Sequence, residues 1–407
     1  MTDSAKLLVL NCGSSSLKYD LFAPWAGDAE PVRVATGFIE GVGPGTARLR
    51  HDPPLTGHRG PVQEVEARDH EAALHVVLDV LRDDWAGLET LGAVAHRVVH
   101  GGPDLSRPAV VDDAVLEAIE SAAVLAPLHN PAALAGIRAV ESLWPGLPQV
   151  VVFDTAFHAT LPAAASTYAI PQELARRHHL RRWGFHGISH QYVSARTADV
   201  LGVPADRVSL VSCHIGNGVS VTAVREGRSI DTSMGFTPMD GAVMGTRSGS
   251  IDPGAVLHLG RTGLSPDEVE DLLQHRSGML GLCGDSDMRR VRERADAGDA
   301  ETVLALEVYS HRLRSLVSSY LGQLPDLHAV VFTAGVGEHD PALRAEVIAP
   351  LAHLGLQLDP DANAAAVGGD RPARIDAGGT PVLVVPTDEG AQVAREAHSA
   401  LFGPVPQ

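Results

Sequence analysis

The stretch that most constrains the fold of this chain lies near its start. Residues 7–22, LLVLNCGSSSLKYDLF, open with an apolar run that predicts a buried strand, break at Asn11 into a Gly-Ser turn, and then become apolar again. Gly13 lets a ligand approach the backbone closely, and Lys18 adds a cation on the returning strand. The hydroxyls and amides of Ser14–Ser16 can bind phosphate. The stretch therefore predicts either a phosphate-binding hairpin or an ordinary Ser-rich hairpin.

Length and charge narrow the class of protein. A chain of 407 residues is expected to form two domains of roughly 150 to 250 residues each. Its formal net charge of -18 argues against nucleic acid and anionic membranes as partners, because like charges repel. An anionic substrate would therefore need a local cluster of basic side chains or a metal ion.

The cysteines and the lengths of the apolar runs indicate the cellular compartment in which the protein is expected. Cys12, Cys213 and Cys283 are odd in number and form no Cys-x-x-Cys pair, so neither a disulfide framework nor a zinc ribbon is expected. The reducing cytosol is the expected compartment. No apolar run approaches ~20 residues, so we expect neither a signal peptide nor a membrane span.

Predicted strands and helices alternate along the chain. The Gly/Pro-rich stretch 24–61 is the exception, and we expect turns and an exposed sheet edge there. Asp69 is placed to cap the first helix. The expected strands are 91–99, 150–153, 208–213, 329–333 and 382–386, and the expected helices are 69–81, 112–125, 301–321 and one from about residue 388.

The pattern of strand, Gly-rich turn and returning strand occurs twice, which indicates an internal duplication. The second copy begins at Val208, continues as HIGNG at 214–218, and returns through a hairpin turn at Glu226-Gly227. Another strand ends in the Gly-rich turn AGVGEH at 334–339. Because ligands collect at strand ends in open α/β folds, these junctions predict a nucleotide cleft. None of them matches a Walker-type P-loop.

Nine segments, in order over nearly the whole length, carry a family resemblance. They are LVLNCGSSSLKY from Leu8, HRVVHGG from His96, APLHNP from Ala126, VFDTAFH from Val152, RRWGFHGISH from Arg181, HIGNG from His214, DTSMGFTPMDG from Asp231, MGTRSGSIDPG from Met244 and FTAGVGEH from Phe332. With them the chain resembles the acetate kinases (acetokinase family), of the superfamily of sugar kinases, Hsp70-type chaperones and actin.

The resemblance implies a duplicated actin-like or sugar-kinase-type α/β fold, with an active-site cleft between two domains that each hold a mixed β-sheet flanked by helices. It implies an N-terminal domain at 1–154, onto which a C-terminal helix at about 388–402 packs back, and a C-terminal domain at 155–387 with most of the nucleotide site. The implied reaction is direct, in-line and reversible phosphoryl transfer from ATP to acetate, giving acetyl phosphate and ADP. Mg²⁺ is the implied metal, with Mn²⁺ as a substitute, and the implied enzyme is a cytoplasmic homodimer without nucleic-acid or membrane partners.

The resemblance also assigns roles to single residues. The catalytic positions are Asp154, His186 and Arg247. The substrate-binding positions are Arg97, which matches the acetate-binding arginine, and Val99, Leu128, His129, Phe185 and Pro238. The cofactor-binding positions are Ser16, Lys18, His214, Ile215, Gly216, Asn217, Gly218, Asp287, Met288, Arg289, Gly335, Val336, Gly337, Glu338 and His339. The metal positions are Asn11 and Glu389.

Physical chemistry supports these roles and qualifies one of them. Transfer between two anions requires charge stabilisation, and a guanidinium stays charged and forks onto a carboxylate or phosphate. Arg97 therefore fits a substrate clamp and Arg247 an oxygen clamp, while His186 could donate a hydrogen bond to the same phosphoryl group. Acetate is already an anion at neutral pH, because carboxyl groups titrate near pH ~4. Asp154 is thus expected to orient Arg97 or a water of the Mg²⁺ shell, rather than to act as a general base.

Two departures from the family pattern and two alternative functions stand beside this interpretation. His339 occupies the position after GVGE where the family usually has Asn, and Thr-Asp-Glu-Gly at 387–390 replaces Thr-Asn-Glu-Glu, which leaves Glu389 alone of the two glutamates. A kinase for propionate or another short carboxylate is the nearer alternative, because pocket size depends on side-chain placement. An actin-like or Hsp70-like ATPase is the other, although it would not need the segments that line the acyl side.

Overall fold

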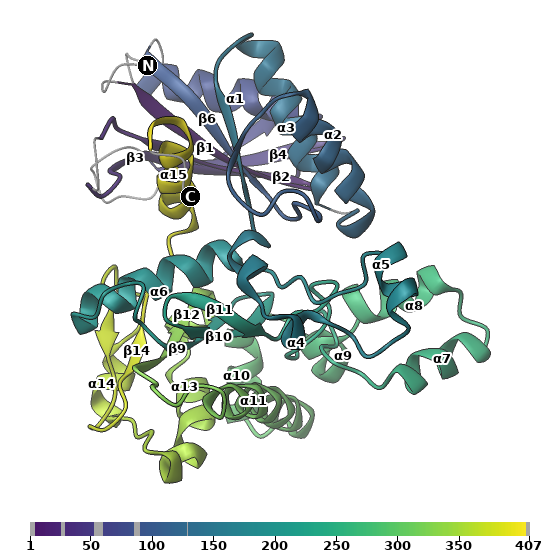
Figure 1. Cartoon of the computed structure of the whole chain (residues 1–407), viewed down its shortest axis with the longest axis vertical. Coiled ribbons are helices and arrows are strands. Elements are labelled where there is room, and N and C mark those ends of the chain that lie inside the picture. The colour runs from purple at the N-terminus through teal and green to yellow at the C-terminus, as the bar shows by residue number, and fades with distance from the viewer. Residues whose placement is uncertain (1–4, 26–28, 53–59, 85–89, 128, 404–407) are drawn as a thin grey trace. The chain divides into compact units, whose positions relative to one another are not determined.

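The chain divides into two compact units, each built around its own β-sheet (Figure 1). The computed structural model describes residues 5–25, 29–52, 60–84, 90–127 and 129–403. Unit 1 consists of Met1–Ala156 and Asp388–Gln407, and unit 2 consists of Phe157–Thr387. The C-terminal segment thus belongs to the same unit as the N-terminal strands.

Unit 1 contains a mixed sheet in the order β5-β4-β3-β2-β1-β6-β8-β7. β1 pairs antiparallel with β2 and parallel with β6, and β6 pairs parallel with β8. The predicted first hairpin is present, but Asn11 lies inside β1 and the turn is confined to Ser14 and Ser15. The strands are β1 Lys6–Gly13, β2 Ser16–Phe22, β3 Arg33–Glu40, β4 Thr46–Asp52, β5 Val62–Glu66, β6 Leu91–Val98, β7 Ala109–Val110 and β8 Gln149–Phe153.

The expectation of only turns and sheet edge in stretch 24–61 is wrong, because β3 and β4 are regular strands within it. Alternation in β3 is blurred by Gly37, which sits under the ring of Tyr19 and has no side chain to mark the pattern. The GVGPG segment at 41–45 does form the connection between these strands. Residues 26–28 and 53–59 of the stretch lie outside the described residues.

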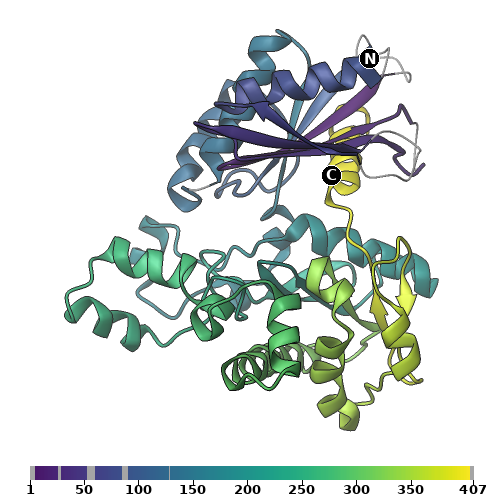
Figure 2. The same cartoon turned by 180° about the vertical axis from the view of Figure 1, so that it is seen from behind.

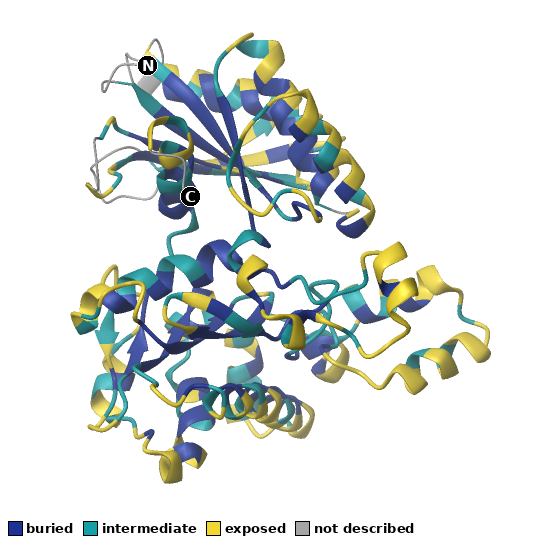
Figure 3. Cartoon of the chain, in the orientation of Figure 1, coloured by how far each residue is buried: buried dark blue, intermediate teal, exposed yellow. Residues whose placement is uncertain are grey.

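Helices cover the sheet of unit 1. The side chains of α1 and α3 share a core with Leu8 and Leu10 of β1, whereas α15 contacts β1, β6 and β8. Asp69 caps α1 as predicted, since its Oδ1 accepts from the amide of Ala72 at 2.8 Å. Figure 3 shows the central strands as buried. The helices are α1 His70–Asp84, α2 Asp113–Ser121, η2 Ala122–Leu125, α3 Asn130–Leu143 and α15 Glu389–Phe402.

Unit 2 repeats the strand arrangement of unit 1. Its order, β11-β10-β9-β12-β14-β13, matches β3-β2-β1-β6-β8-β7 strand for strand, with the same antiparallel and parallel pairings. The predicted duplication and the α/β class are therefore confirmed. The strands are β9 Leu210–Ile215, β10 Val219–Arg225, β11 Arg228–Thr232, β12 Ala329–Thr333, β13 Ala373–Arg374 and β14 Val382–Val384.

Helix α6 contacts β9 and β12, while α11 contacts β9 and β10 and lies on the other side of this sheet (Figure 2). The predicted long helix is α11, capped by Asp299. The predicted Gly-rich turn at 334–339 is instead the short helix α12. The helices are η3 Ala156–Thr160, α4 Ala163–Ser166, α5 Gln172–Arg177, α6 Gly187–Leu201, α7 Pro253–Arg261, α8 Pro266–His275, α9 Gly278–Cys283, α10 Met288–Asp296, α11 Ala300–Leu321, α12 Ala334–His339, α13 Pro341–Ile348, η4 Ala349–Leu354 and α14 Pro360–Ala365. No helix in the described ranges has the length and apolar character to cross a bilayer.

Both units bury histidines that must be neutral. In unit 1, His96 Nε2–H donates to Gln149 Oε1 at 2.8 Å. In unit 2, His158 Nε2 lies 3.0 Å from the carbonyl of Phe185, which can only accept, so Nε2 carries the proton and Nδ1 accepts from the Ser229 hydroxyl at 2.8 Å. Burial lowers the pKa of each of these two imidazoles to about 4.

The two histidines predict a loss of stability in mild acid. Between pH 6.5 and 4 the unfolded chain binds protons that the folded chain does not, so the free energy of unfolding falls as the pH falls through this window. At pH 5 each histidine should remove about 2 kcal/mol relative to pH 7.5. Urea unfolding at both pH values measures this difference. His96→Gln should reduce it by its own share, and replacement of the exposed His178 by Gln should not; equal pH dependence in all three proteins would contradict the assignment.

Candidate functional site

A charged cluster forms at the carboxyl ends of parallel strands in unit 1. Leu10 on β1 pairs with His96 on β6, so Asn11 and Arg97 come next on the two strands. Asp154 directly follows β8, the neighbour of β6 on its other side. Carboxyl ends of parallel strands are where α/β folds collect ligands.

Arg97 is the centre of this cluster. Its Nε and Nη2 donate to Asp154 Oδ1 and Oδ2 at 3.1 and 2.5 Å, and its Nη1 donates to Asn11 Oδ1 at 3.3 Å. Glu389, the first residue of α15, places Oε2 3.9 Å from Arg97 Nε. The predicted positions Asn11, Arg97, Asp154 and Glu389 therefore lie together, and the side chain of Asp154 is only 2% exposed.

Burial and charge act in opposite directions here. Burial disfavours the Arg97 guanidinium, but the carboxylates of Asp154 and Glu389 outweigh it and raise the pKa of Arg97, which stays a cation. Burial raises the pKa of Asp154 and the Arg97 charge works against that rise. Within the described chain the cluster combines one guanidinium with two carboxylates, so an added cation would meet a net negative charge.

The donor set of this cluster fits Mg²⁺. Asn11, Asp154 and Glu389 offer oxygen atoms, the ligands that this hard cation prefers, and Mg²⁺ usually takes one or two carboxylates and keeps several waters. Across the described residues no three His, Cys, Asp or Glu side chains gather as a cage for a metal ion. The residues therefore suit a partly hydrated Mg²⁺ and not a metal enclosed by protein.

The first hairpin lies beside the cluster. Lys18 on β2 is exposed and pairs with Asn11 across the two strands, and Ser16 pairs with Gly13. A Cβ atom at Gly13 would come within 2.6 Å of Ser16 Oγ, so the glycine leaves room for that hydroxyl. His70, which sequence reasoning missed, donates from Nε2 to the carbonyl of Gly13 at 2.8 Å and anchors the turn to α1.

In unit 2 the predicted phosphate loop meets two predicted catalytic side chains. His186 precedes α6 with a left-handed backbone (φ +57), a conformation that non-Gly residues seldom adopt and that often marks functional sites. A Cβ atom at Gly218 would lie 3.1 Å from His186 Cε1 and 3.4 Å from Arg247 Nη1. Glycine at this position lets both side chains approach the turn.

Arg247 is held by backbone and loop contacts. Its Nη1 donates to the carbonyl of Pro238 at 3.3 Å, and burial lowers its pKa, although a guanidinium remains charged. The loop that carries it is fixed to the phosphate loop, because the Gly245 amide donates to the Asn217 carbonyl at 3.0 Å. The predicted residues His186, Asn217, Gly218, Arg247 and Pro238 are thus neighbours within unit 2.

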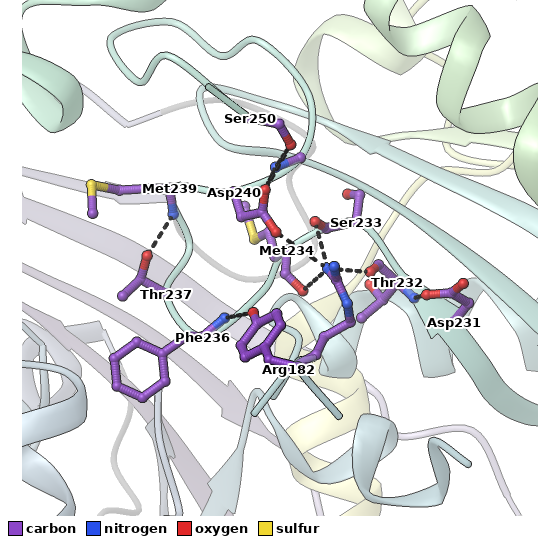
Figure 4. A network of polar contacts seen from close by, with 12 residues as sticks. Arg182, Asp231, Thr232, Ser233, Met234, Phe236, Thr237, Met239, Asp240 and Ser250 are labelled. Atoms are coloured by element: carbon purple, nitrogen blue, oxygen red, sulfur yellow. Dashed lines mark hydrogen bonds and ion pairs between the residues drawn. The ribbon is translucent and has the colours of Figure 1, made fainter. Parts of the chain in front are cut away.

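Figure 4 shows the network that shapes the segment carrying Pro238. Arg182 Nη1 donates to the carbonyls of Thr232, Ser233 and Met234 at 2.9 to 3.0 Å and lies 3.5 Å from Asp240 Oδ2. Sequence reasoning missed this support, although Arg182 stands in the RRWGFHGISH segment from which His186 was predicted.

The predicted adenosine-side residues are largely engaged in internal contacts. Glu338 Oε1 accepts from the amides of Ala334 and Thr387 at 2.7 and 3.1 Å. Asp287 caps α10 and accepts from Arg289 Nη2 at 2.8 Å, contacts that lower the pKa of Asp287 to about 2. His339 is exposed and donates from Nδ1 to the Gly335 carbonyl at 2.9 Å.

A buried arginine that sequence reasoning missed supports α12. Arg344 is fully buried and donates to the Gly337 carbonyl and to Asn363 Oδ1, each at 2.8 Å. Burial lowers the pKa of Arg344 to about 10, so it is still charged at neutral pH. No sequence motif indicates that Arg344 supports Gly337, and only the folded structure shows this contact.

The predicted acetate pocket remains a prediction. Val99 and His129 are half-buried in unit 1, and in unit 2 Phe185 is buried and Pro238 half-buried. Leu128 lies outside the described residues.

Known proteins resemble the chain over nearly its whole length. The model of the acetokinase family matches residues 6–395. An acetate kinase of Streptomyces avermitilis is 48% identical over 401 residues, 98% of each chain, and one of Leifsonia xyli is 49% identical over 402 residues, 97% of this chain and 98% of that one.

Solved structures agree with these relatives. Porphyromonas gingivalis acetate kinase matches with a TM-score of 0.90 and 37% identity, covering 98% of this chain and 100% of that one. A propionate kinase from Francisella tularensis matches with a TM-score of 0.89 and 39% identity, covering 96% and 98%. The predicted resemblance, and with it the prediction of a phosphotransferase that acts on a carboxyl group, is confirmed.

The departure at Gly390 has a structural reason. Asp20, only 3% exposed, forms an ion pair with Arg33 at 2.8 Å, and Arg33 also bonds Asp388, the N-cap of α15. A Cβ atom at Gly390 would lie 2.3 Å from Asp20 Oδ2 and 3.2 Å from Arg33 Nη2. The ion pair therefore excludes the glutamate that the family usually has at this position.

Gly390→Ala should destabilise unit 1 even though Ala favours helices. Helix propensity would gain about 1 kcal/mol, and the clash with a buried ion pair should cost about 1 to 3 kcal/mol, so we expect a lower urea midpoint. Gly260→Ala in α7 is the matched control, because nothing lies within 4 Å of a Cβ atom there, and it should raise the midpoint slightly. A Gly390→Ala variant that is as stable as the parent, or more stable like Gly260→Ala, would contradict the clash.

Proposed function

We propose that this chain, which belongs to the acetokinase family, transfers the terminal phosphoryl group of ATP to acetate, reversibly, to give acetyl phosphate and ADP. The observation that carries the proposal is the environment of Arg97. In the described chain, Asp154 and Asn11 accept from three of its five N–H groups, which leaves two for a carboxylate. A half-buried, permanently charged and pre-oriented guanidinium is suited to holding a small carboxylate.

We assign the metal to the same cluster. Asn11 and Glu389 would hold it, with Asp154 close enough to bind one of its waters. Mg²⁺, when bound there, would supply positive charge that offsets the charge of the phosphates. Asp154 accepts the fork of Arg97, and acetate has no proton to lose near neutral pH, so we assign Asp154 to positioning and not to proton removal.

We assign the phosphates to unit 2. The backbone of the HIGNG loop would bind them, and Arg247 and His186 would donate to the oxygens on which negative charge builds during in-line transfer. We assign the adenosine end to residues 287–289 and 335–339 through their backbone, since the Glu338 and Asp287 side chains are engaged elsewhere. The exposed side chain of His339 would then affect the selectivity of the site among nucleotides.

Propionate is the second candidate substrate. The similarity to a propionate kinase structure, at 39% identity, is as high as that to an acetate kinase structure, at 37%. The two acids differ by one methylene, which a change in a single apolar side chain can accommodate.

We also keep as proposals three further implications of the resemblance: a homodimer, a cytoplasmic location and the use of Mn²⁺ in place of Mg²⁺. Analytical ultracentrifugation of the purified chain tests the first, with a single species at twice the mass of 42.7 kDa as the expected result.

The function is tested by a hydroxamate assay on purified protein with ATP, Mg²⁺ and a series of fatty acids. Acetyl phosphate should form, and EDTA should abolish turnover. Slow ATP hydrolysis that no carboxylate alters would instead place the chain with the ATPases.

Arg247→Ala and Arg97→Ala should have different kinetic effects. Loss of Arg247 should lower kcat by about 10³ to 10⁵ and leave the KM for ATP little changed, because a charge-stabilising arginine acts in the transition state. Loss of Arg97 should chiefly raise the KM for acetate. Arg177→Ala is the control, since this exposed side chain pairs only with Glu173 in the described structure. Equal effects of both changes on kcat and on the KM for acetate would refute these separate roles of Arg247 and Arg97.

Val99→Ala should shift the preference of the enzyme toward longer acids. If Val99 packs against the methyl group, a methylene should be worth about 10- to 200-fold in kcat/KM, and the variant should lose part of that discrimination. The measurement is kcat/KM for acetate, propionate and butyrate, with Val62→Ala on β5 as the exposed control. An unchanged ratio would remove Val99 from the pocket, and a parent enzyme that prefers propionate would favour the second candidate.

A further inference from the structure

A chain of hydroxyl and imidazole groups runs behind His186 in unit 2. His186 Nδ1 lies 3.0 Å from Ser220 Oγ, and the same oxygen lies 2.7 Å from His190 Nε2. His190 Nδ1 in turn lies 2.8 Å from Ser212 Oγ. Ser220, His190 and Ser212 are all 0% exposed, so no bulk water shares these contacts.

The protons of this series of hydroxyl and imidazole groups can be counted. Burial holds the pKa of His190 well below its ordinary value, and nearby His158 and His214 add to this, so the His190 ring is neutral and has one N–H. The Ser220 hydroxyl has one proton but contacts two ring nitrogens, so one of the two imidazoles must donate to it. Two opposite directions of donation are therefore compatible with the distances.

In one direction His186 carries its proton on Nε2, and in the other on Nδ1. A Cβ atom at Gly218 would lie 3.2 Å from His186 Nε2 and 3.4 Å from Arg247 Nη1, so Nε2 borders the turn and the arginine to which we assign the phosphoryl oxygens. An N–H at this position would donate to those oxygens, whereas a lone pair would be repelled by them.

We propose, on the basis of the proposed function, that Ser220 and His190 are positioning residues that keep the proton of His186 on Nε2. Ser212 O–H donates to His190 Nδ1, His190 Nε2–H donates to Ser220 Oγ, and Ser220 O–H donates to His186 Nδ1. His186 then presents its Nε2–H as a donor to the transferred group.

The ring of His186 is fixed in the same place by other contacts. It stacks on His214 with ring centroids 4.2 Å apart, and His214 Nδ1 lies 2.8 Å from Ser189 Oγ. Ser189 in turn bonds the Thr387 hydroxyl at 2.8 Å. One ring face and the Nδ1 edge of His186 are thereby held, and the Ser220 contact acts on the nitrogen whose protonation defines the tautomer.

Nitrogen NMR of the full chain labelled with ¹⁵N-histidine tests the tautomer directly. The His186 signals are identified by their loss in His186→Gln, and we expect the Nε2–H form at pH 7.5. Ser220→Ala should give a mixture of tautomers, and so, to a lesser degree, should Ser212→Ala, which also serves if the first variant does not fold. An Nδ1–H form in the parent protein, or no change in either variant, would overturn the proposal.

Kinetics test the functional consequence. Ser220→Ala should lower kcat by about 10- to 100-fold with little change in the KM values for ATP and acetate. In a His186→Ala background the same change should have almost no further effect, because both act through one contact. Thr222→Val on the same strand removes a buried hydroxyl that bonds Thr232 and should leave kcat unchanged.

Equal losses from Ser220→Ala in both backgrounds would reveal a merely structural role and contradict the proposal. The NMR result does not depend on turnover. A parent protein that phosphorylates no carboxylate would therefore refute the proposed function while the tautomer assignment is still decided by its own measurement.

Discussion

The contact on which the charged cluster of unit 1 depends is the fork of Arg97 on Asp154. Both groups lie at the ends of neighbouring parallel strands, and Asp154 is almost wholly buried. A carboxylate as buried as that of Asp154 would cost several kcal/mol without a partner, and the half-buried Arg97 guanidinium supplies that partner. The pair orients Arg97, and the second carboxylate of Glu389 leaves an excess of negative charge that a metal ion can neutralise.

The duplicated sheets place different chemistry at equivalent strand ends. In unit 1 the ends of β1, β6 and β8 carry Asn11, Arg97 and Asp154, a set built on full charges. In unit 2 the end of the equivalent strand β9 carries His214, which belongs to an array of imidazoles and hydroxyls. Full charges can hold a carboxylate and a metal, whereas imidazole and hydroxyl groups can add hydrogen bonds to phosphate oxygens beside the charge of Arg247.

Local patterns in the sequence were enough to predict the hairpins, the strand 329–333 and the long helix α11, because alternation, turn residues and caps act over a few residues. The type I′ turn at Glu226-Gly227, where both residues have positive φ, is one such case. Strands β3 and β4 were missed because Gly and Pro around them weaken the local signal, and their pairing with β2 supplies what propensity does not. Tertiary contacts here outweigh local preference.

The candidate site likewise contains residues that motifs single out and residues that only the folded structure identifies. Motifs singled out Arg97, Asp154 and His186, whose roles stay predictions, but not the residues that support other parts of the candidate site. Arg182 reaches carbonyls 50 to 52 residues away, and Arg344 bonds carbonyls on two other segments. The spacing between these arginines and the carbonyls they bond follows no sequence pattern, because the carbonyls come close to the arginines only in the folded protein.

The segment 387–390 shows how a departure from a motif can be compensated nearby. The family pattern Thr-Asn-Glu-Glu contains two carboxylates, and Thr-Asp-Glu-Gly in this chain also contains two, at Asp388 and Glu389. Asp388 caps α15 and pairs with Arg33, which is itself paired with buried Asp20. These contacts fix the first turn of α15, and Glu389 is the first residue of that turn. In this chain the second carboxylate of the segment thus stands at position 388, where it caps the helix that begins with Glu389, and the glycine at 390 leaves room for the ion pair of Arg33 and Asp20.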